Sequence, residues 1–75
     1  MTVEIKYCGM CGGKDKAEMV AEELRAYMGI AAVLNDVGKG AFEVLVDGNL
    51  LFSMPLVGRY PLRMEIVNLL RAKYK

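Results

Sequence analysis

The sequence predicts an α/β domain with the element order β-α-β-β-β-α, a four-stranded mixed sheet and two helices. Three observations along the 75 residues point to this class. Apolar residues alternate near the start, then recur at three- and four-residue steps over 14–28, and alternate again over 42–54 on both sides of a turn. A chain of this length has room for one compact core, so we expect a single domain over 1–75.

The first half of the chain predicts a strand, a helix and a second strand. Apolar and charged residues alternate over 3–7, which is the period of a strand, and glycines then end the pattern. Residues 14–28 place their apolar side chains on one helical face, and Gly29 is suited to the C-cap. The short apolar run 30–34 predicts the second strand.

The second half predicts a loop, a hairpin and a last helix. Residues 35–40 have the composition of a loop, and the alternating residues 42–46 predict the third strand. A turn at 47–49, with the sequence Asp-Gly-Asn, leads to a fourth strand over 50–54. Pro61 can open the last helix at its first turn, because apolar residues follow it at helical spacing.

Connection rules then predict the order of the strands. The strand-helix-strand unit makes the first and second strands parallel neighbours, whereas the hairpin strands are antiparallel. If the third strand pairs with the first, the sheet order is 2-1-3-4. This order brings the loops 8–13, 35–40 and 55–60 to one edge of the sheet.

Composition limits the partners and the compartment. Ten basic and nine acidic residues leave a net charge of +1, without a long run of either sign, so nucleic acid is not an expected partner. No stretch approaches the roughly 18 apolar residues of a membrane span, and the N-terminus lacks a signal pattern, so we expect a cytoplasmic protein without a membrane partner. In that reducing compartment a close cysteine pair is more often redox-active, catalytic or metal-binding than structural.

Both cysteines of the chain lie in the segment KYCGMCGGK, residues 6–14. Cys8 and Cys11 follow the first strand and precede the first helix, where the helix N-terminus and nearby lysines favour a thiolate. No acidic residue stands between Glu4 and Asp15 to oppose it. Two intervening residues let the sulfurs meet, so we expect a catalytic pair that cycles between dithiol and disulfide.

Other interpretations of the pair stay open. Zinc prefers about four ligands, and the chain has no histidine and no further cysteine, so we expect no metal site within one chain. A dimer could still supply four cysteines to a bridging zinc. The two cysteines could also be small buried apolar residues. In a further alternative the domain docks a partner through its cysteine edge, switched by its redox state and without turnover.

The CGMC motif at 8–11, the segment GAFEVLVDGNLLFS at 40–53 and GRYP at 58–61 resemble the selenoprotein W, T and H family, the Rdx proteins. The short selenoprotein W-like branch is the most similar. The resemblance implies a thioredoxin-like fold and a thiol oxidoreductase role, with glutathione as the thiol partner of some members. The family's selenocysteine falls on Cys11, which that analogy makes the reactive centre. Thioredoxins instead attack with the position of Cys8; we expect both to act as a reversible pair and slightly favour Cys11.

The rim of the site is expected to include Gly9, Met10, Gly12, Arg59 and Tyr60. Arg59 is a candidate contact for an anion such as a glutathione carboxylate, although a solvated surface arginine is the simpler interpretation. Thioredoxins place a cis-proline before the third strand, and the segment 36–41 contains no proline. A general protein-disulfide reductase is therefore not expected. We expect no cofactor, and a protein or a low-molecular-weight thiol or disulfide, such as glutathione, as the partner.

Overall fold

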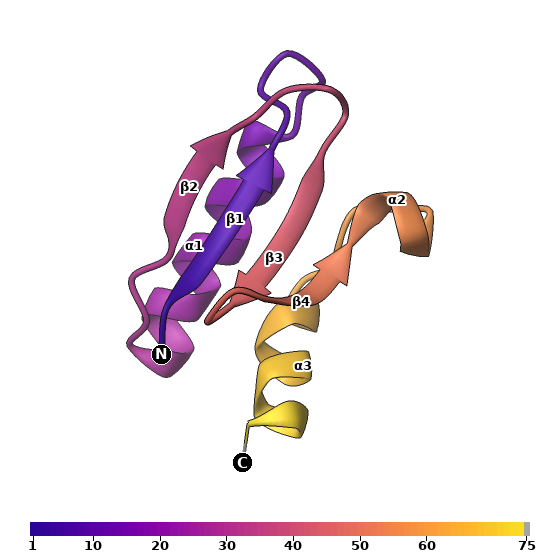
Figure 1. Cartoon of the computed structure of the whole chain (residues 1–75). Helices are drawn as coiled ribbons and strands as arrows, with labels where there is room; N and C mark the ends of the chain where they lie inside the picture. The colour runs from indigo at the N-terminus through magenta and orange to yellow at the C-terminus, as the bar shows by residue number, and fades with distance from the viewer. Residues whose placement is uncertain (75) are drawn as a thin grey trace.

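The computed structural model describes residues 1–74, which form four strands and three helices (Figure 1). The strands are β1 (Val3–Tyr7), β2 (Val33–Asp36), β3 (Phe42–Val46) and β4 (Asn49–Ser53). The helices are α1 (Lys14–Met28), α2 (Met54–Val57) and α3 (Glu65–Lys73). The predicted α/β class is confirmed, and α2 is a short helix that the sequence did not predict. Within residues 1–74 no helix is both long and apolar enough to cross a membrane.

The four strands form one mixed sheet in the order β2-β1-β3-β4, which confirms the predicted order. Strands β1 and β2 are parallel, and Tyr7 lies beside Asp36 at their carboxyl ends. Strand β3 is antiparallel to β1 and places Phe42 on the other side of Tyr7. The end of β1 therefore lies between residues of both neighbouring strands, at the edge where the cysteine segment begins.

The β3-β4 hairpin turns at Asp47 and Gly48, whose φ angles are 51° and 83°. Positive φ at both central residues is the geometry of a type I′ turn, which suits the twist of the strands and favours Asp-Gly. The register shifts between Val44 and Leu45, which marks a β-bulge in the hairpin. The turn predicted over 47–49 is thus confirmed at Asp47 and Gly48, whereas Asn49 already belongs to β4.

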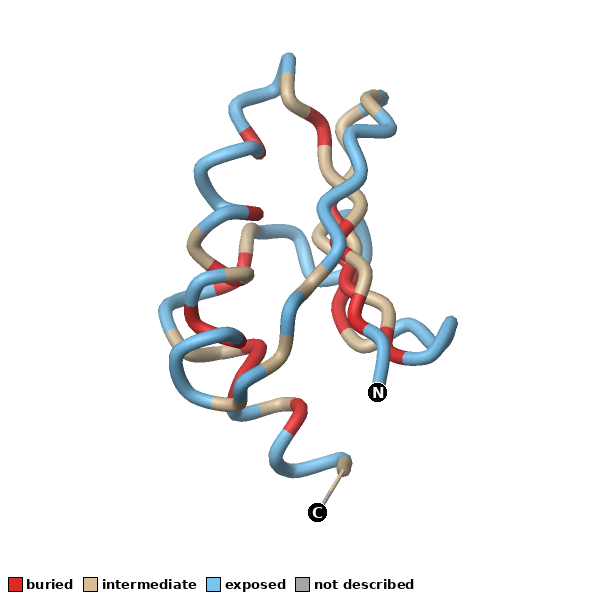
Figure 2. The backbone as a smooth tube through the Cα atoms, turned by 90° about the vertical axis from the view of Figure 1, so that its left-hand side faces the viewer, coloured by how far each residue is buried: buried red, intermediate tan, exposed pale blue. Residues whose placement is uncertain are grey.

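Helices α1 and α3 pack on one face of the sheet, and the buried residues lie where the two layers meet (Figure 2). Alternate strand residues and helix residues at three- and four-residue steps supply this core. Its members are Val3, Ile5, Ala17, Val20, Leu24, Phe42, Val44, Val46, Phe52, Ile66, Val67 and Leu70. Burial of their apolar surface holds the helices against the sheet.

The cap of α1 explains why the second strand starts later than predicted. Gly29 has a left-handed φ of 67° at the C-cap. The amide of Ile30 donates to the carbonyl of Leu24 (3.1 Å), which closes a Schellman-type cap. Because the cap uses the start of the predicted strand 30–34, those bounds are wrong, and β2 instead spans Val33–Asp36.

The segment before α3 also departs from the prediction. The expected strand residue Met54 begins α2, and α3 begins at Glu65 rather than near Pro61. Met64 is the N-cap of α3, and its amide donates to both carboxylate oxygens of Glu23 from α1, at 3.1 Å each. This partly buried contact holds the start of α3 against α1. Sequence periodicity cannot reveal it, because it joins residues that are 41 positions apart.

Candidate functional site

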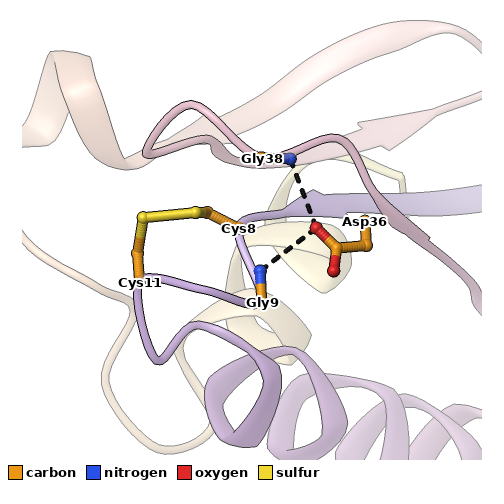
Figure 3. Close-up of a disulfide and its surroundings, with 5 residues drawn as sticks. All are labelled: Cys8, Gly9, Cys11, Asp36 and Gly38. Atoms are coloured by element: carbon orange, nitrogen blue, oxygen red, sulfur yellow. Dashed lines mark hydrogen bonds between the residues drawn. A yellow bond between two sulfur atoms is a disulfide. The ribbon is translucent and has the colours of Figure 1, made fainter.

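Cys8 and Cys11 lie between the end of β1 and the start of α1, and they form a disulfide bond (Figure 3). Their Cα atoms are 5.3 Å apart, a distance usual for disulfides. The strand and the helix thus position the two sulfurs at the junction that the sequence indicates. A pair that can close in this way can also exchange with an external disulfide.

Backbone hydrogen bonds close the turn that carries the two sulfurs. The carbonyl of Cys8 accepts hydrogen bonds from the amides of Cys11 (3.3 Å) and Gly13 (3.0 Å). The carbonyl of Gly9 accepts one from the amide of Gly12 (3.2 Å). Gly12 has a φ of 81°, which glycine adopts without steric cost. The glycines of the motif therefore serve the turn geometry.

The two cysteines differ in exposure. Cys8 is only 2% exposed, whereas Cys11 is exposed. Met10, between them, is fully exposed at 101%. Another molecule can therefore reach Cys11 and the tip of the turn, while Cys8 is covered by the protein.

Asp36, the last residue of β2, contacts the cysteine turn. Its Oδ1 atom accepts hydrogen bonds from the amides of Gly9 (3.1 Å) and Gly38 (3.2 Å), as Figure 3 shows. Asp36 is not among the site residues predicted from the sequence. The available signal was the predicted strand order, which brings the ends of the first two strands together, but it does not place individual side chains.

The charges around the turn are mixed. Gly13, the N-cap of α1, forms no side-chain cap, and Lys14 and Lys16 are exposed. These features favour a thiolate near the start of the helix. Asp15 lies in the first turn of α1, and Asp36 adds a carboxylate from β2. No acidic residue lies between Glu4 and Asp15 in the sequence, but the fold brings the carboxylate of Asp36 to the same turn from β2.

Tyr60 lies beside the turn. Its ring packs edge to face on Phe42, with centroids 5.3 Å apart and an interplanar angle of 84°. Its hydroxyl oxygen is 3.5 Å from the position that a Cβ atom on Gly13 would take. The structure thus brings the GRYP segment to the start of α1, next to the residue that follows the cysteine motif.

Arg59 is engaged within its own segment. Its guanidinium group donates to both carboxylate oxygens of Glu65, at 2.7 and 3.0 Å, and to the carbonyl of Tyr60. Hydrogen bonds from Arg59 and from the amide of Leu62 lower the pKa of Glu65, and the bond to Glu65 raises the pKa of Arg59. An incoming anion would have to compete with Glu65 for this side chain.

A metal site would need groups beyond those gathered in one chain. Among residues 1–74, no group of three or more His, Cys, Asp or Glu side chains is placed to hold a metal ion. Cys8 and Cys11 are bonded to each other, so in this state neither is a thiolate ligand. A zinc ion shared between two chains would need the reduced form of both.

The chain is similar to known proteins in sequence and in structure. The Rdx family model matches residues 2–72. A crystal structure of a protein from Bordetella parapertussis has a TM-score of 0.88 at 23% identity, covering 96% of this chain and 95% of that chain. A selenoprotein W-related protein from Vibrio cholerae has a TM-score of 0.88 at 22% identity, covering 99% and 96%. No curated protein sequence matches the chain. Because the family model covers nearly all of its residues, the chain belongs to the Rdx family.

Proposed function

We propose that the protein is a cytoplasmic thiol/disulfide redox protein that exchanges electrons with partners through Cys8 and Cys11. One observation carries the proposal: a disulfide at the junction of β1 and α1 joins a buried cysteine to an exposed one. Such a pair separates the attacking sulfur from the resolving sulfur. Membership of the Rdx family supports a thiol-based role.

The proposed reaction has two exchange steps. In the reduced protein the Cys11 thiolate attacks one sulfur of an external disulfide, forms a mixed disulfide with it and releases the other half as a thiolate, which takes up a proton. The Cys8 thiolate then attacks the Cys11 sulfur, which closes the intramolecular disulfide and releases the second external thiol. The protein loses two electrons and the external disulfide gains them. The reverse steps, with two external thiols, restore the dithiol.

The exposure of the two sulfurs supports this assignment of roles. Cys11 is exposed and can meet an external disulfide, whereas Cys8 is 2% exposed and can meet only a sulfur already bound at Cys11. Resolution by Cys8 is then intramolecular and proceeds at a high effective concentration. We therefore assign attack to Cys11.

The proposed partner is a protein or a low-molecular-weight thiol or disulfide, with glutathione as the small partner. Gly9, between the two cysteines, and Gly12, directly after Cys11, have no side chains that would shield the pair, and Met10 offers an exposed apolar contact. Tyr60 lies beside the same turn, so these residues are the proposed rim. The proposed role of Arg59 as an anion contact requires exchange of its partner Glu65.

Single cysteine variants test the assignment. In a glutathione disulfide solution we expect Cys8→Ser to retain a mixed disulfide on Cys11, because the resolving sulfur is absent. We expect Cys11→Ser to form at least about ten-fold less mixed disulfide, because Cys8 is buried. Mass spectrometry of the acid-quenched protein measures both. The exchange model fails if neither variant traps glutathione, and the assignment of roles is reversed if only Cys11→Ser does so.

A second candidate is a redox-switched binding module without turnover. Its supporting observations are two exposed apolar side chains, Met10 in the cysteine turn and Val37, 42% exposed, in the loop after β2, which suit a protein contact. A coupled disulfide reduction assay separates the candidates: turnover supports the redox carrier, whereas redox-dependent binding without turnover supports the module. Metal bound at one ion per two reduced chains would support the zinc-bridged dimer.

A further inference from the structure

We propose that Asp36 is a positioning residue for disulfide exchange: it fastens the cysteine turn to the end of β2 in the geometry that lets Cys8 resolve a mixed disulfide on Cys11. The inference rests on the proposed function, because it concerns the closure of the same pair. In this role Asp36 does not contact the reacting sulfurs. It acts through the backbone of Gly9.

The contact joins two loops that are far apart in the sequence. Oδ1 of Asp36 accepts from the Gly9 amide, which directly follows Cys8, and from the Gly38 amide in the loop after β2. The Gly38 amide also donates to the carbonyl of Tyr7, the residue before Cys8. Figure 3 shows the carboxylate on the side of the turn away from the disulfide. The backbone is thus held on both sides of Cys8, at Tyr7 and at Gly9.

The hydrogen bonds that Asp36 accepts restrain a turn whose glycine-rich backbone is flexible by itself. Three of the six residues 8–13 are glycines, and Gly9, inside the ring that the disulfide closes, has more backbone freedom to lose on closure than any other residue type would. Gly9 also lies so close to Asp36 that a Cβ atom there would collide with Oδ2. The carboxylate therefore occupies the space that a side chain at position 9 would need, and limits how the turn can move.

The hydrogen bond from Gly9 to Asp36 affects the second step of the exchange. With a partner sulfur bound to Cys11, the Cys8 thiolate attacks the Cys11 sulfur, the bond to the partner breaks, and the partner leaves as a thiolate that takes up a proton. The rate of this step depends on how often the Cys8 sulfur meets the mixed disulfide. Restricting the backbone at Gly9 raises that frequency, and it favours the closed disulfide over the open dithiol.

The test uses the full chain in a defined glutathione redox buffer, with four variants. Asp36→Ala removes the acceptor, and Asp36→Asn keeps an oxygen in the same place. Asp36→Val gives a second form without the acceptor that suits an exposed edge strand. The control is Asp47→Ala, because Asp47 is also exposed and its Oδ1 accepts a distant backbone amide, that of Thr2 at 2.7 Å, at the other end of β1.

Loss of the acceptor is expected to lower the equilibrium constant for forming the intramolecular disulfide about five-fold. This factor corresponds to the net stabilisation that one hydrogen bond typically contributes. That change raises the reduction potential by about 20 mV. The glutathione mixed disulfide on Cys11 should also resolve about five-fold more slowly. Asp36→Asn should stay within about two-fold of wild type, since the amide oxygen can still accept. Asp47→Ala should lower the stability, because its left-handed φ of 51° strains alanine, while its redox constant stays that of wild type.

Several results would overturn the inference. It is wrong if Asp36→Ala and Asp36→Val keep the wild-type constant and resolution rate, or if Asp47→Ala shifts them equally, which would indicate a general effect of stability. It is also wrong if Asp36→Asn behaves as Asp36→Ala does, because charge and not the hydrogen bond would then be responsible. If the wild-type protein forms no reversible disulfide in the redox buffer, the proposed function itself is wrong. If the wild-type protein forms a reversible disulfide and Asp36→Ala has the same equilibrium constant and resolution rate, only this inference is wrong.

Discussion

At the scale of single residues, close contacts with neighbouring atoms favour glycine at two positions of the cysteine segment. A Cβ atom on Gly9 would collide with the carboxylate of Asp36, and one on Gly13 would lie 2.9 Å from the carbonyl oxygen of Cys8. Contacts that short force a neighbouring group to move. At Gly9 that group is an exposed side chain, whereas at Gly13 it is backbone, which yields less readily.

Gly9→Ala should therefore destabilise the protein through Asp36. We expect the free energy of unfolding to fall by about 1–2 kcal/mol, because the methyl group displaces the carboxylate from the amide at position 9. In the background of Asp36→Ala the same change should cost less than about 0.5 kcal/mol, a coupling that a double-mutant cycle measures. Urea unfolding of the four proteins checks it. Equal costs in both backgrounds would show that Asp36 does not occupy this space.

At the scale of elements, the start of α3 is set by polar contacts rather than by helix propensity. Met64, at the N-cap, has a left-handed φ of 64°, and its amide is bound by the buried Glu23 of α1. Glu65, in the first turn, accepts from the amide of Leu62 (2.8 Å) and from Arg59. Its negative charge at the helix N-terminus is also favourable. These contacts hold the GRYP segment, and with it Tyr60, beside the cysteine turn.

The Glu65 contacts predict a pH dependence of stability. Hydrogen bonds from Arg59 and Leu62 lower the pKa of Glu65 in the folded protein. A carboxyl with a lowered folded pKa stabilises the protein above its unfolded pKa, and this contribution is lost as the pH falls through the folded pKa. Wild type should therefore be more stable than Glu65→Gln at pH 7, and the difference should shrink as the pH falls below the unfolded pKa of about 4.3 and vanish below the folded pKa.

Urea unfolding of both proteins between neutral and acidic pH measures this difference. Glu22→Gln is the matched control, since Glu22 also pairs with an arginine, Arg25, but both side chains are largely exposed. Such surface pairs contribute little, so the control should follow wild type. A difference between wild type and Glu65→Gln that persists unchanged at acidic pH would contradict the assigned ion pair.

At the scale of the whole molecule, the hydrophobic cluster that holds the helices on the sheet does not include the disulfide, although Cys8 itself is buried. The core cluster joins the sheet to α1 and α3 and contains neither cysteine. The disulfide closes a ring of only four residues, Cys8 to Cys11. Loop-closure entropy grows with ring size, so a ring this small stabilises the fold modestly. The proposed redox role requires a fold that persists in both states, and a core cluster that does not include the disulfide supports such a fold.

Reduction should therefore leave the protein folded. We expect dithiothreitol to lower the free energy of unfolding by about 2 kcal/mol or less, the chain-entropy value for so short a loop. Urea unfolding followed by circular dichroism, with and without the reductant, measures the change. A reduced protein that is unfolded at 25 °C would show that the disulfide is structural, and would argue against cycling between two redox states.

Local signals in the sequence predicted most of the fold. The amphipathic pattern over 14–28 and the glycine after it gave the bounds of α1, and Asp47-Gly48 gave the hairpin turn. Connection rules supplied the strand order. The bounds of β2, the short helix α2 and the start of α3 were missed. A helix cap competes with the local pattern at the start of β2, and a distant carboxylate does so at the start of α3.

The sequence by itself determined the class of fold, the sheet order and the position of a cysteine pair between a strand and a helix. Periodicity, turn chemistry and chain connectivity are properties of neighbouring residues, so they can be read along the chain. The tertiary structure decided that Cys8 is buried and Cys11 exposed, and that Asp36 reaches the turn across 27 residues. Burial and hydrogen bonding of this kind depend on which distant segments meet, and that is settled only when the sheet and helices pack together.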